Sequence, residues 1–281
     1  MINALEVTNL KKSYGDFSLD IPKLSLPSGC IMGFIGENGA GKTTTVKLLL
    51  DLIRPDGGDI RLLGETIKDG GKKLREQIGV VMDESCFPEN ISLRDADKIM
   101  KSSYKTWDSG RFKELAEKFS LPEKKRVKEY SRGMKMKLSI AVALSHDSRL
   151  LILDEATSGL DPIVRDEILD VFLDFIQDEG HSIFVSSHII SDLEKVCDYI
   201  VFLHEGKLVF CEEKDALLDK YVVVKCSAGE YDALEKSKVI GARKSSFGVQ
   251  ALMERAYAPR GLMADMASVE DIMLYFVKEA K

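Results

Sequence analysis

The 281 residues carry 40 Lys plus Arg and 46 Asp plus Glu, a formal net charge of -6, and 44% of them are hydrophobic. This composition is typical of a soluble globular protein with one large domain, or a large and a small one. The acidic balance and the scattered cations disfavour broad electrostatic capture of nucleic acid. No apolar run reaches the roughly 20 residues of a membrane span, and the first residues lack the pattern of a signal peptide. We therefore expect a cytoplasmic protein.

The first third of the chain combines strand-like and helix-like patterns. Residues 2–7 and 17–21 alternate apolar and polar side chains as half-buried strands do, and residues 31–35 form a short apolar run that ends at Gly36. Residues 43–53 then have the pattern of a helix. The order strand, glycine-rich loop, helix is thus predicted at one place in the chain.

The middle of the chain predicts a mainly parallel sheet. Further strands are expected at 60–63, 78–82, 150–153, 182–186 and 199–203, with helices at 163–178 and 189–196. From 92 to 144 the apolar period is helical, which predicts a helical insertion between two of these strands. Strands that alternate with helices in this way favour an α/β fold, with helices covering the sheet and antiparallel strands at the N-terminal side.

The end of the chain predicts a separate unit. A hairpin strand follows Glu205-Gly206-Lys207, and a helix is expected near 214–218. The remainder mixes short strands with short helices, one of them opened by Ser268 with Glu270 close behind. We predict a large domain at 1–220, with a helical subdomain at about 84–145, and a small α+β domain at 221–281.

A phosphate-binding loop is predicted between the strand at 31–35 and the helix that follows it. Residues 36–44 read Gly-Glu-Asn-Gly-Ala-Gly-Lys-Thr-Thr and match G-x-x-x-x-G-K-[ST]. In such a loop the backbone N–H groups and the helix N-terminus bind phosphates, the lysine reaches the β and γ phosphates, and the next hydroxyl binds Mg²⁺. The nucleotide-binding residues expected here are Gly36, Asn38, Gly39, Ala40, Gly41, Lys42, Thr43 and Thr44.

Two carboxylates end the apolar strand at 150–153. Ligands of open α/β sheets gather at the carboxyl ends of the strands, so Asp154 and Glu155 are placed where a nucleotide would be bound. A P-loop nucleotidase needs an acidic group there to hold Mg²⁺, which fits Asp154, and Glu155 is then free to polarise the attacking water. Alone, the pattern also fits a strand that ends in a solvated loop. Beside the glycine-rich motif it indicates nucleotide hydrolysis.

Further motifs follow the order of a known family. Residues 130–134, Tyr-Ser-Arg-Gly-Met, precede a Lys-rich helix, and residues 158–161 read Ser-Gly-Leu-Asp, with His188 further along. Together with the two motifs above, they make the sequence resemble the nucleotide-binding subunit of an ATP-binding cassette (ABC) transporter. In that family these segments are the signature motif, the D-loop and the switch histidine, and Tyr14 lies where the family stacks an aromatic ring on adenine. The resemblance covers residues 1 to about 220.

Two motifs depart from the family's pattern. The usual signature Leu-Ser-Gly-Gly-Gln is Tyr-Ser-Arg-Gly-Met here, which keeps Ser131 and Gly133. A hydroxyl and close backbone N–H groups at a helix N-terminus suit a γ-phosphate. The family's Gln after the strand at 78–82 corresponds to Asp83, a carboxylate that can bind Mg²⁺ through water. The signature variant resembles single-cassette subunits of the bacitracin and drug export type, which favours export over import.

The resemblance implies an ATPase built from two cassettes, a homodimer or a pair with a second cassette. ATP would lie between the phosphate-binding loop of one cassette and Ser131 and Gly133 of the other. Glu155 would be the general base, and His188 would contact the γ-phosphate. Mg²⁺ would be held by Thr43, Asp154 and Asp83.

The resemblance also implies a transmembrane permease subunit as partner. That subunit would be docked by the helical insertion, would hold the chain at the inner face of the cell membrane and would carry the substrate site. No nucleic-acid partner is expected.

Three alternatives remain open at this point. A soluble ABC ATPase acting on ribosomes or DNA would usually need two cassettes or a long coiled-coil insertion. A monomeric P-loop kinase would not need the segment 130–134 or Asp161. A module that holds ATP without cleaving it would be expected to lack Glu155.

Overall fold

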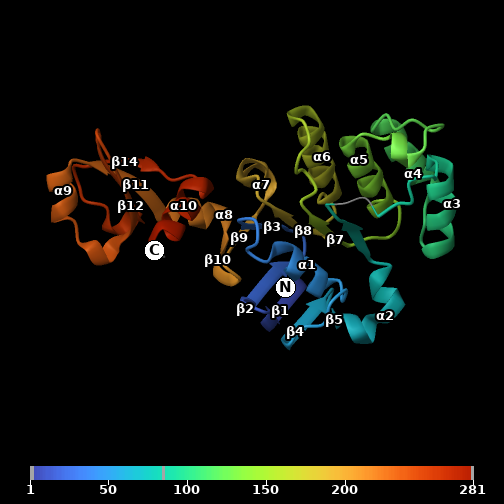
Figure 1. Ribbon diagram of the computed structural model, residues 1–281, viewed down its shortest axis with the longest axis horizontal. Helices are drawn as coiled ribbons and strands as arrows, with labels where there is room; N and C mark the ends of the chain where they lie inside the picture. Colours follow the sequence, from blue (N-terminus) through green and yellow to red (C-terminus); the bar gives the residue numbers. More distant parts are fainter. Residues whose placement is uncertain (1–2, 84–85, 280–281) are drawn as a thin grey trace. The chain divides into compact units, whose positions relative to one another are not determined.

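The computed structural model describes residues 3–83 and 86–279 and divides the chain into two units. These are Met1–Cys211 and Glu212–Lys281, the second drawn in orange and red in Figure 1. The structure groups helix α8 (Lys214–Lys220) with the second unit, whereas the predicted division after residue 220 places it in the first. The predicted start of the helical subdomain at residue 84 lies outside the described residues.

The first unit is built on a ten-stranded sheet with the order β5-β4-β1-β2-β10-β9-β3-β8-β7-β6. Its strands are β1 (Asn3–Tyr14), β2 (Phe17–Pro27), β3 (Ile31–Gly36), β4 (Gly57–Leu62), β5 (Glu65–Thr66), β6 (Ile78–Val81), β7 (Leu150–Asp154), β8 (Ser182–Ser187), β9 (Tyr199–His204) and β10 (Lys207–Glu213). Strands β6, β7, β8, β3 and β9 pair in parallel, whereas β2, β1, β4 and β5 pair antiparallel. This mixed sheet confirms the predicted α/β fold with antiparallel strands at the N-terminal side.

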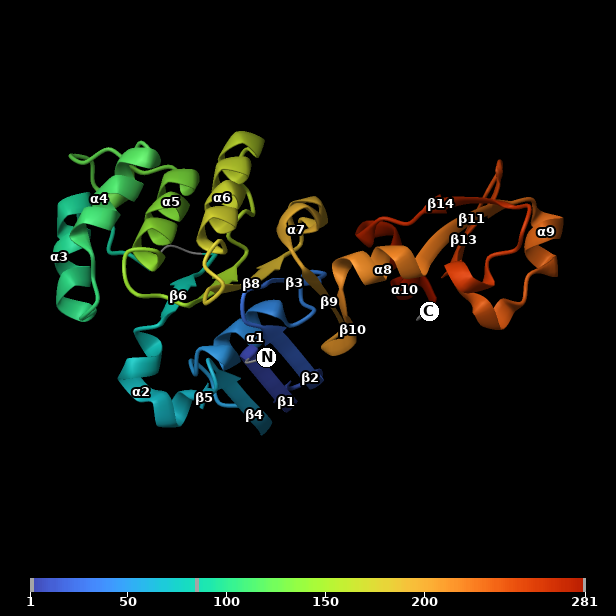
Figure 2. The ribbon, with the colours of Figure 1, turned by 180° about the vertical axis from the view of Figure 1, so that it is seen from behind.

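Helices cover this sheet and form the predicted insertion (Figures 1 and 2). They are α1 (Lys42–Leu49), α2 (Ile67–Arg75), α3 (Leu93–Ser103), α4 (Ser109–Lys118), α5 (Arg132–Ala143), α6 (Pro162–Phe175) and α7 (Ile190–Val196), with a 3₁₀ turn at Val127–Glu129. Helix α3 packs on α4, and α4 packs on α5. The α6 helix begins as its sequence indicates, because Asp161 Oδ1 accepts hydrogen bonds of 3.1 Å from the N–H groups of Ile163 and Val164.

The first helix ends earlier than expected, and the second helix was not expected. The helix expected at 43–53 ends at Leu49, because the chain turns at Asp51, whose φ of 56° is left-handed. Helix α2 was not predicted. It contains Gly71 in a non-helical conformation, and because glycine has a low helix propensity, the residues 67–75 do not predict a helix.

The parallel strands β3, β7 and β8 position the residues of the candidate site. Every residue of β3, β7 and β8 is buried, as expected for strands covered on both faces. Ile35 pairs with Ser187, and Asp154 pairs with Ser186. The carboxyl ends of these three strands therefore lie side by side, which brings together three segments that are far apart in the sequence.

The second unit is a small α+β fold. Its antiparallel sheet has the order β12-β13-β11-β14, with β11 (Tyr221–Cys226), β12 (Val239–Ser245), β13 (Gly248–Glu254) and β14 (Met263–Met266). Its helices are α8, α9 (Ala228–Ala233) and α10 (Val269–Glu279), with 3₁₀ turns at Lys236–Lys238 and Arg255–Tyr257. Ser268 opens α10 as expected, but the acidic partner of its hydroxyl is Asp271 at 2.7 Å rather than Glu270.

Candidate active site

The glycine-rich loop joins β3 to α1 in a conformation that the glycines allow. Gly41 precedes α1 with a φ of 110°, which a residue with a Cβ rarely adopts. A Cβ on Gly36 would lie 2.6 Å from the carbonyl oxygen of Leu203, so the loop passes against the end of β9. Lys42 closes the loop, since its Nζ donates to the carbonyl oxygens of Gly36 (2.8 Å) and Glu37 (3.3 Å).

The two carboxylates at the end of β7 have different surroundings. Asp154 is buried and accepts a hydrogen bond from the hydroxyl of Ser186 on the neighbouring strand β8. The N–H of Glu155 donates to the carbonyl oxygen of Ser186 at 3.0 Å. Glu155 has a φ of 53°, a strained conformation for a non-glycine residue that this contact to β8 supports. No role was predicted for Ser186, which lies at the end of β8, two residues before His188.

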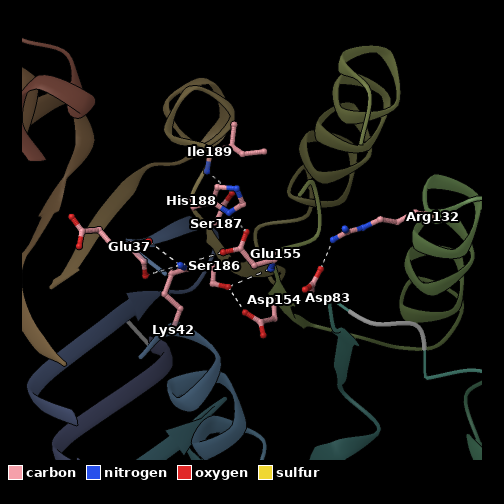
Figure 3. Close-up of polar contacts among 11 residues, drawn as sticks. Glu37, Lys42, Asp83, Arg132, Asp154, Glu155, Ser186, Ser187, His188 and Ile189 are labelled. Carbon is pink, nitrogen blue, oxygen red and sulfur yellow. Dashed lines mark hydrogen bonds and ion pairs between the residues drawn. The ribbon is translucent and has the colours of Figure 1, made fainter. Parts of the chain in front are cut away.

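Glu155 connects the loop to the histidine (Figure 3). Its Oε1 lies 3.3 Å from Lys42 Nζ, and its Oε2 accepts a hydrogen bond of 2.7 Å from His188 Nδ1. The Glu155 side chain is 12% exposed, whereas that of His188 is 45% exposed. Because Nδ1 serves Glu155, the other ring nitrogen of His188 is left for a ligand. The structure thus brings three residues from three separate motifs into direct contact.

A cavity of about 480 Å³ opens beside these residues. Its walls come from the start of β2, the glycine-rich loop, the segments that follow β6, β7 and β8, the start of α5 and the turn before α6. The lining residues are Phe17, Glu37, Asn38, Gly39, Gly41, Lys42, Thr43, Thr44, Asp83, Arg132, Glu155, Ser158 and His188. A backbone loop rich in N–H groups, a lysine and an arginine are suited to polyphosphate.

The donor set also fits Mg²⁺. Thr43, Asp83 and Asp154 carry the hydroxyl and carboxylate oxygens that suit Mg²⁺. Thr43 and Asp83 line the cavity, whereas Asp154 is buried beside it and is not among the lining residues. Among the described residues no group of three or more His, Cys, Asp or Glu side chains could hold a metal ion. In nucleotide sites Mg²⁺ usually takes several of its ligands from phosphate and water.

The aromatic residue in the cavity wall is not the one that the sequence singled out. Tyr14 lies at the end of β1, 47% exposed, with Lys12 Nζ 5.2 Å from its ring centre. Its cross-strand partner Phe17 lines the cavity. The sequence could have pointed to Phe17, because it is separated from Tyr14 by only two residues and a tight turn would place the two rings on paired strands.

The signature-like segment contributes one side chain to this cavity. Ser131 is the N-cap of α5, and its Oγ accepts a hydrogen bond from Met134 N at 3.3 Å. Ser131 and Gly133 are not among the residues that line the cavity, but Arg132 between them is, and it forms a 2.6 Å ion pair with Asp83.

A glycine-rich loop between strand and helix, in a parallel sheet whose strand two places away ends in acids, defines a P-loop nucleotide-binding protein. The model of the ABC transporter family matches residues 19–158. The bacitracin transport ATP-binding protein BcrA of Bacillus licheniformis is 38% identical over 212 residues, which cover 74% of this chain and 69% of that protein. The lantibiotic transport ATP-binding protein SrtF of Streptococcus pyogenes is 36% identical over 214 residues, 75% of this chain and 91% of that protein.

Solved structures agree with these relatives. An ATP binding subunit of an ABC transporter superimposes with a TM-score of 0.69 at 28% identity, covering 76% of this chain and 91% of the other. The chain therefore belongs to the ABC transporter ATP-binding family and is an ATPase subunit, as its motifs predicted. These matches lend no support to action on ribosomes or DNA. Among the described residues, no helix is both long and apolar enough to cross a bilayer.

Proposed function

We propose that this chain hydrolyses Mg²⁺-ATP to drive export through a separate permease. The observation that supports this most directly is the position of Glu155, whose carboxylate joins Lys42 of the phosphate-binding loop to His188 at the end of β8. The relatives named for bacitracin and lantibiotic transport support a role in transport. The signature variant favours export.

Each motif has a defined task in this proposal. The N–H groups of the glycine-rich loop and Lys42 bind the phosphates, and Thr43, Asp154 and Asp83 hold Mg²⁺. The bound ion neutralises phosphate charge. Glu155 orients a water and accepts its proton. His188 contacts the γ-phosphate with the ring nitrogen that does not serve Glu155.

A second cassette completes the site. Ser131 and Gly133 lie at the start of α5, outside the cavity of their own chain; Ser131 is exposed and Gly133 is half-buried. These donors would serve ATP bound to the partner cassette. Hydrolysis would then depend on closure of two cassettes, because phosphoryl transfer requires mainly positioning and charge stabilisation.

Purification from native membranes tests the proposal. The tagged chain, recovered from gently solubilised membranes, should bring with it a polytopic membrane subunit, and the complex should release phosphate from Mg²⁺-ATP. Inside-out vesicles that contain the complex should accumulate substrate on addition of ATP, as export requires. Recovery with ribosomes and no membrane subunit would contradict the proposal and favour the soluble alternative.

A further inference from the structure

Two of the departures from the family's pattern, at residues 83 and 132, meet in the structure. Asp83 follows β6 at the position of the family's Gln, and Arg132 begins α5 at the position of the first signature Gly. They are 49 residues apart, yet Arg132 Nη2 lies 2.6 Å from Asp83 Oδ1 (Figure 3). Where the family's pattern has two neutral residues, Gln and Gly, this chain has two oppositely charged side chains in contact.

A third position leaves room for this contact. A Cβ on Gly159, in the D-loop-like turn, would lie 2.8 Å from Arg132 Nη1 and 3.0 Å from its Cζ. The guanidinium therefore lies against backbone that carries no side chain. Arg132 connects three segments of one chain: the start of α5, the end of β6 and the turn that follows β7.

The charges of the cavity wall indicate how the Arg132–Asp83 ion pair would affect nucleotide binding. Three acids, Glu37, Asp83 and Glu155, line the cavity, and among the described lining residues the Lys and Arg side chains are Lys42 and Arg132. Glu155 already faces Lys42. Without Arg132, the Asp83 carboxylate would face the nucleotide phosphates uncompensated and would repel them.

We propose that Arg132 is a positioning residue for Asp83 in the same chain. It holds the Asp83 carboxylate at the cavity wall and cancels its charge toward nucleotide, so that the two departures from the family's pattern compensate each other. This inference rests on the proposed function, since it requires nucleotide phosphates in the cavity. Because the two side chains are 53% and 47% exposed, we expect the pair to matter for ligand charge more than for folding.

Titration calorimetry of ATP with a chelator in place of metal tests the charge compensation. Arg132→Gln keeps the side-chain stem and removes the charge, and Asp83→Asn is isosteric. From the usual strength of exposed ion pairs, Arg132→Gln should weaken metal-free ATP binding roughly two- to fivefold and Asp83→Asn should strengthen it by a similar factor. The double variant should lie within about twofold of the wild type. A merely structural role predicts weaker binding in both single variants, and that result would overturn the inference.

Steady-state hydrolysis against Mg²⁺ concentration tests the positioning. Each single variant should lower kcat, whereas the double variant should exceed both, and Arg132→Lys should retain more activity than Arg132→Gln. Losses that simply multiply in the double variant would contradict a coupled pair.

The Lys118–Asp174 ion pair provides matched controls. It joins α4 to α6 at 2.9 Å with exposed fractions of 53% and 67%, and neither residue lines this cavity. Lys118→Gln and Asp174→Asn should leave both readouts unchanged. Opposite shifts in metal-free ATP affinity without any hydrolysis by the wild type would refute the ATPase role while supporting the pair. If the wild type hydrolyses ATP but Arg132→Gln and Asp83→Asn shift the metal-free ATP affinity in the same direction, the inference about the pair is refuted and the ATPase role stands.

Discussion

Replacing Glu155 by Gln tests the centre of the active site. The side chain is 12% exposed, with Lys42 Nζ at 3.3 Å and His188 Nδ1 at 2.7 Å. Glutamine has the same size, and its carbonyl oxygen can still accept a hydrogen bond from either group. The backbone strain at φ 53° is also the same for both residues. What the variant loses is the charge and the ability to take a proton from water.

The expected effect is large on chemistry and small on stability. Loss of a general base lowers the rate roughly 10²- to 10⁴-fold. At about 1.4 kcal/mol for each factor of ten, this raises the barrier by about 3 to 5 kcal/mol. Exchange of charge-assisted hydrogen bonds for neutral ones should lower the free energy of unfolding by only about 1 kcal/mol. Affinity for Mg²⁺-ATP should be retained, because the removed charge is negative and the ligand is an anion.

Single-turnover hydrolysis, with protein in excess over ATP, measures the chemical step directly. Calorimetric titration of the same samples with Mg²⁺-ATP shows that the variant still binds. Glu205→Gln is a matched control, because Glu205 is also a glutamate with positive φ, at 45°, but it is exposed and does not line the cavity. A single-turnover rate for Glu155→Gln within threefold of the wild-type rate would refute the assignment of Glu155 as the base.

Four other substitutions test the rest of the site. Lys42→Ala should weaken Mg²⁺-ATP binding roughly 10- to 100-fold, the worth of one charge-assisted contact, and an unchanged calorimetric titration would argue against the phosphate-binding loop. Tyr14→Ala and Phe17→Ala should each cost about 1 kcal/mol of ATP affinity if these rings support the base; equal affinities for both variants and the wild type would exclude that role. Ser186→Ala should lower the free energy of unfolding by about 1 to 3 kcal/mol, because buried Asp154 loses its hydroxyl donor. A urea midpoint equal to that of the wild type would show that this contact is not needed.

The sequence predicted the parts of the fold that depend on local pattern. Short apolar runs identified β3, β7, β8 and β9, because strands covered on both faces are rich in apolar residues. The cap at Asp161 and the order of strand, glycine-rich loop and helix were likewise visible along the chain. Helix α2 was missed because it contains Gly70 and Gly71, and glycine strongly lowers helix propensity.

The sequence by itself therefore determined the P-loop class, the family and the motifs, since each motif is a short run of residues with its own chemistry. The tertiary structure alone decided which side chains meet. Glu155 lies between Lys42 and His188 because β3, β7 and β8 pair in a register that brings their carboxyl ends together. Arg132 reaches Asp83 because the start of α5 lies near the end of β6 and because Gly159, which has no side chain, leaves space for the guanidinium. Such contacts depend on strand register and side-chain reach, which no local pattern encodes.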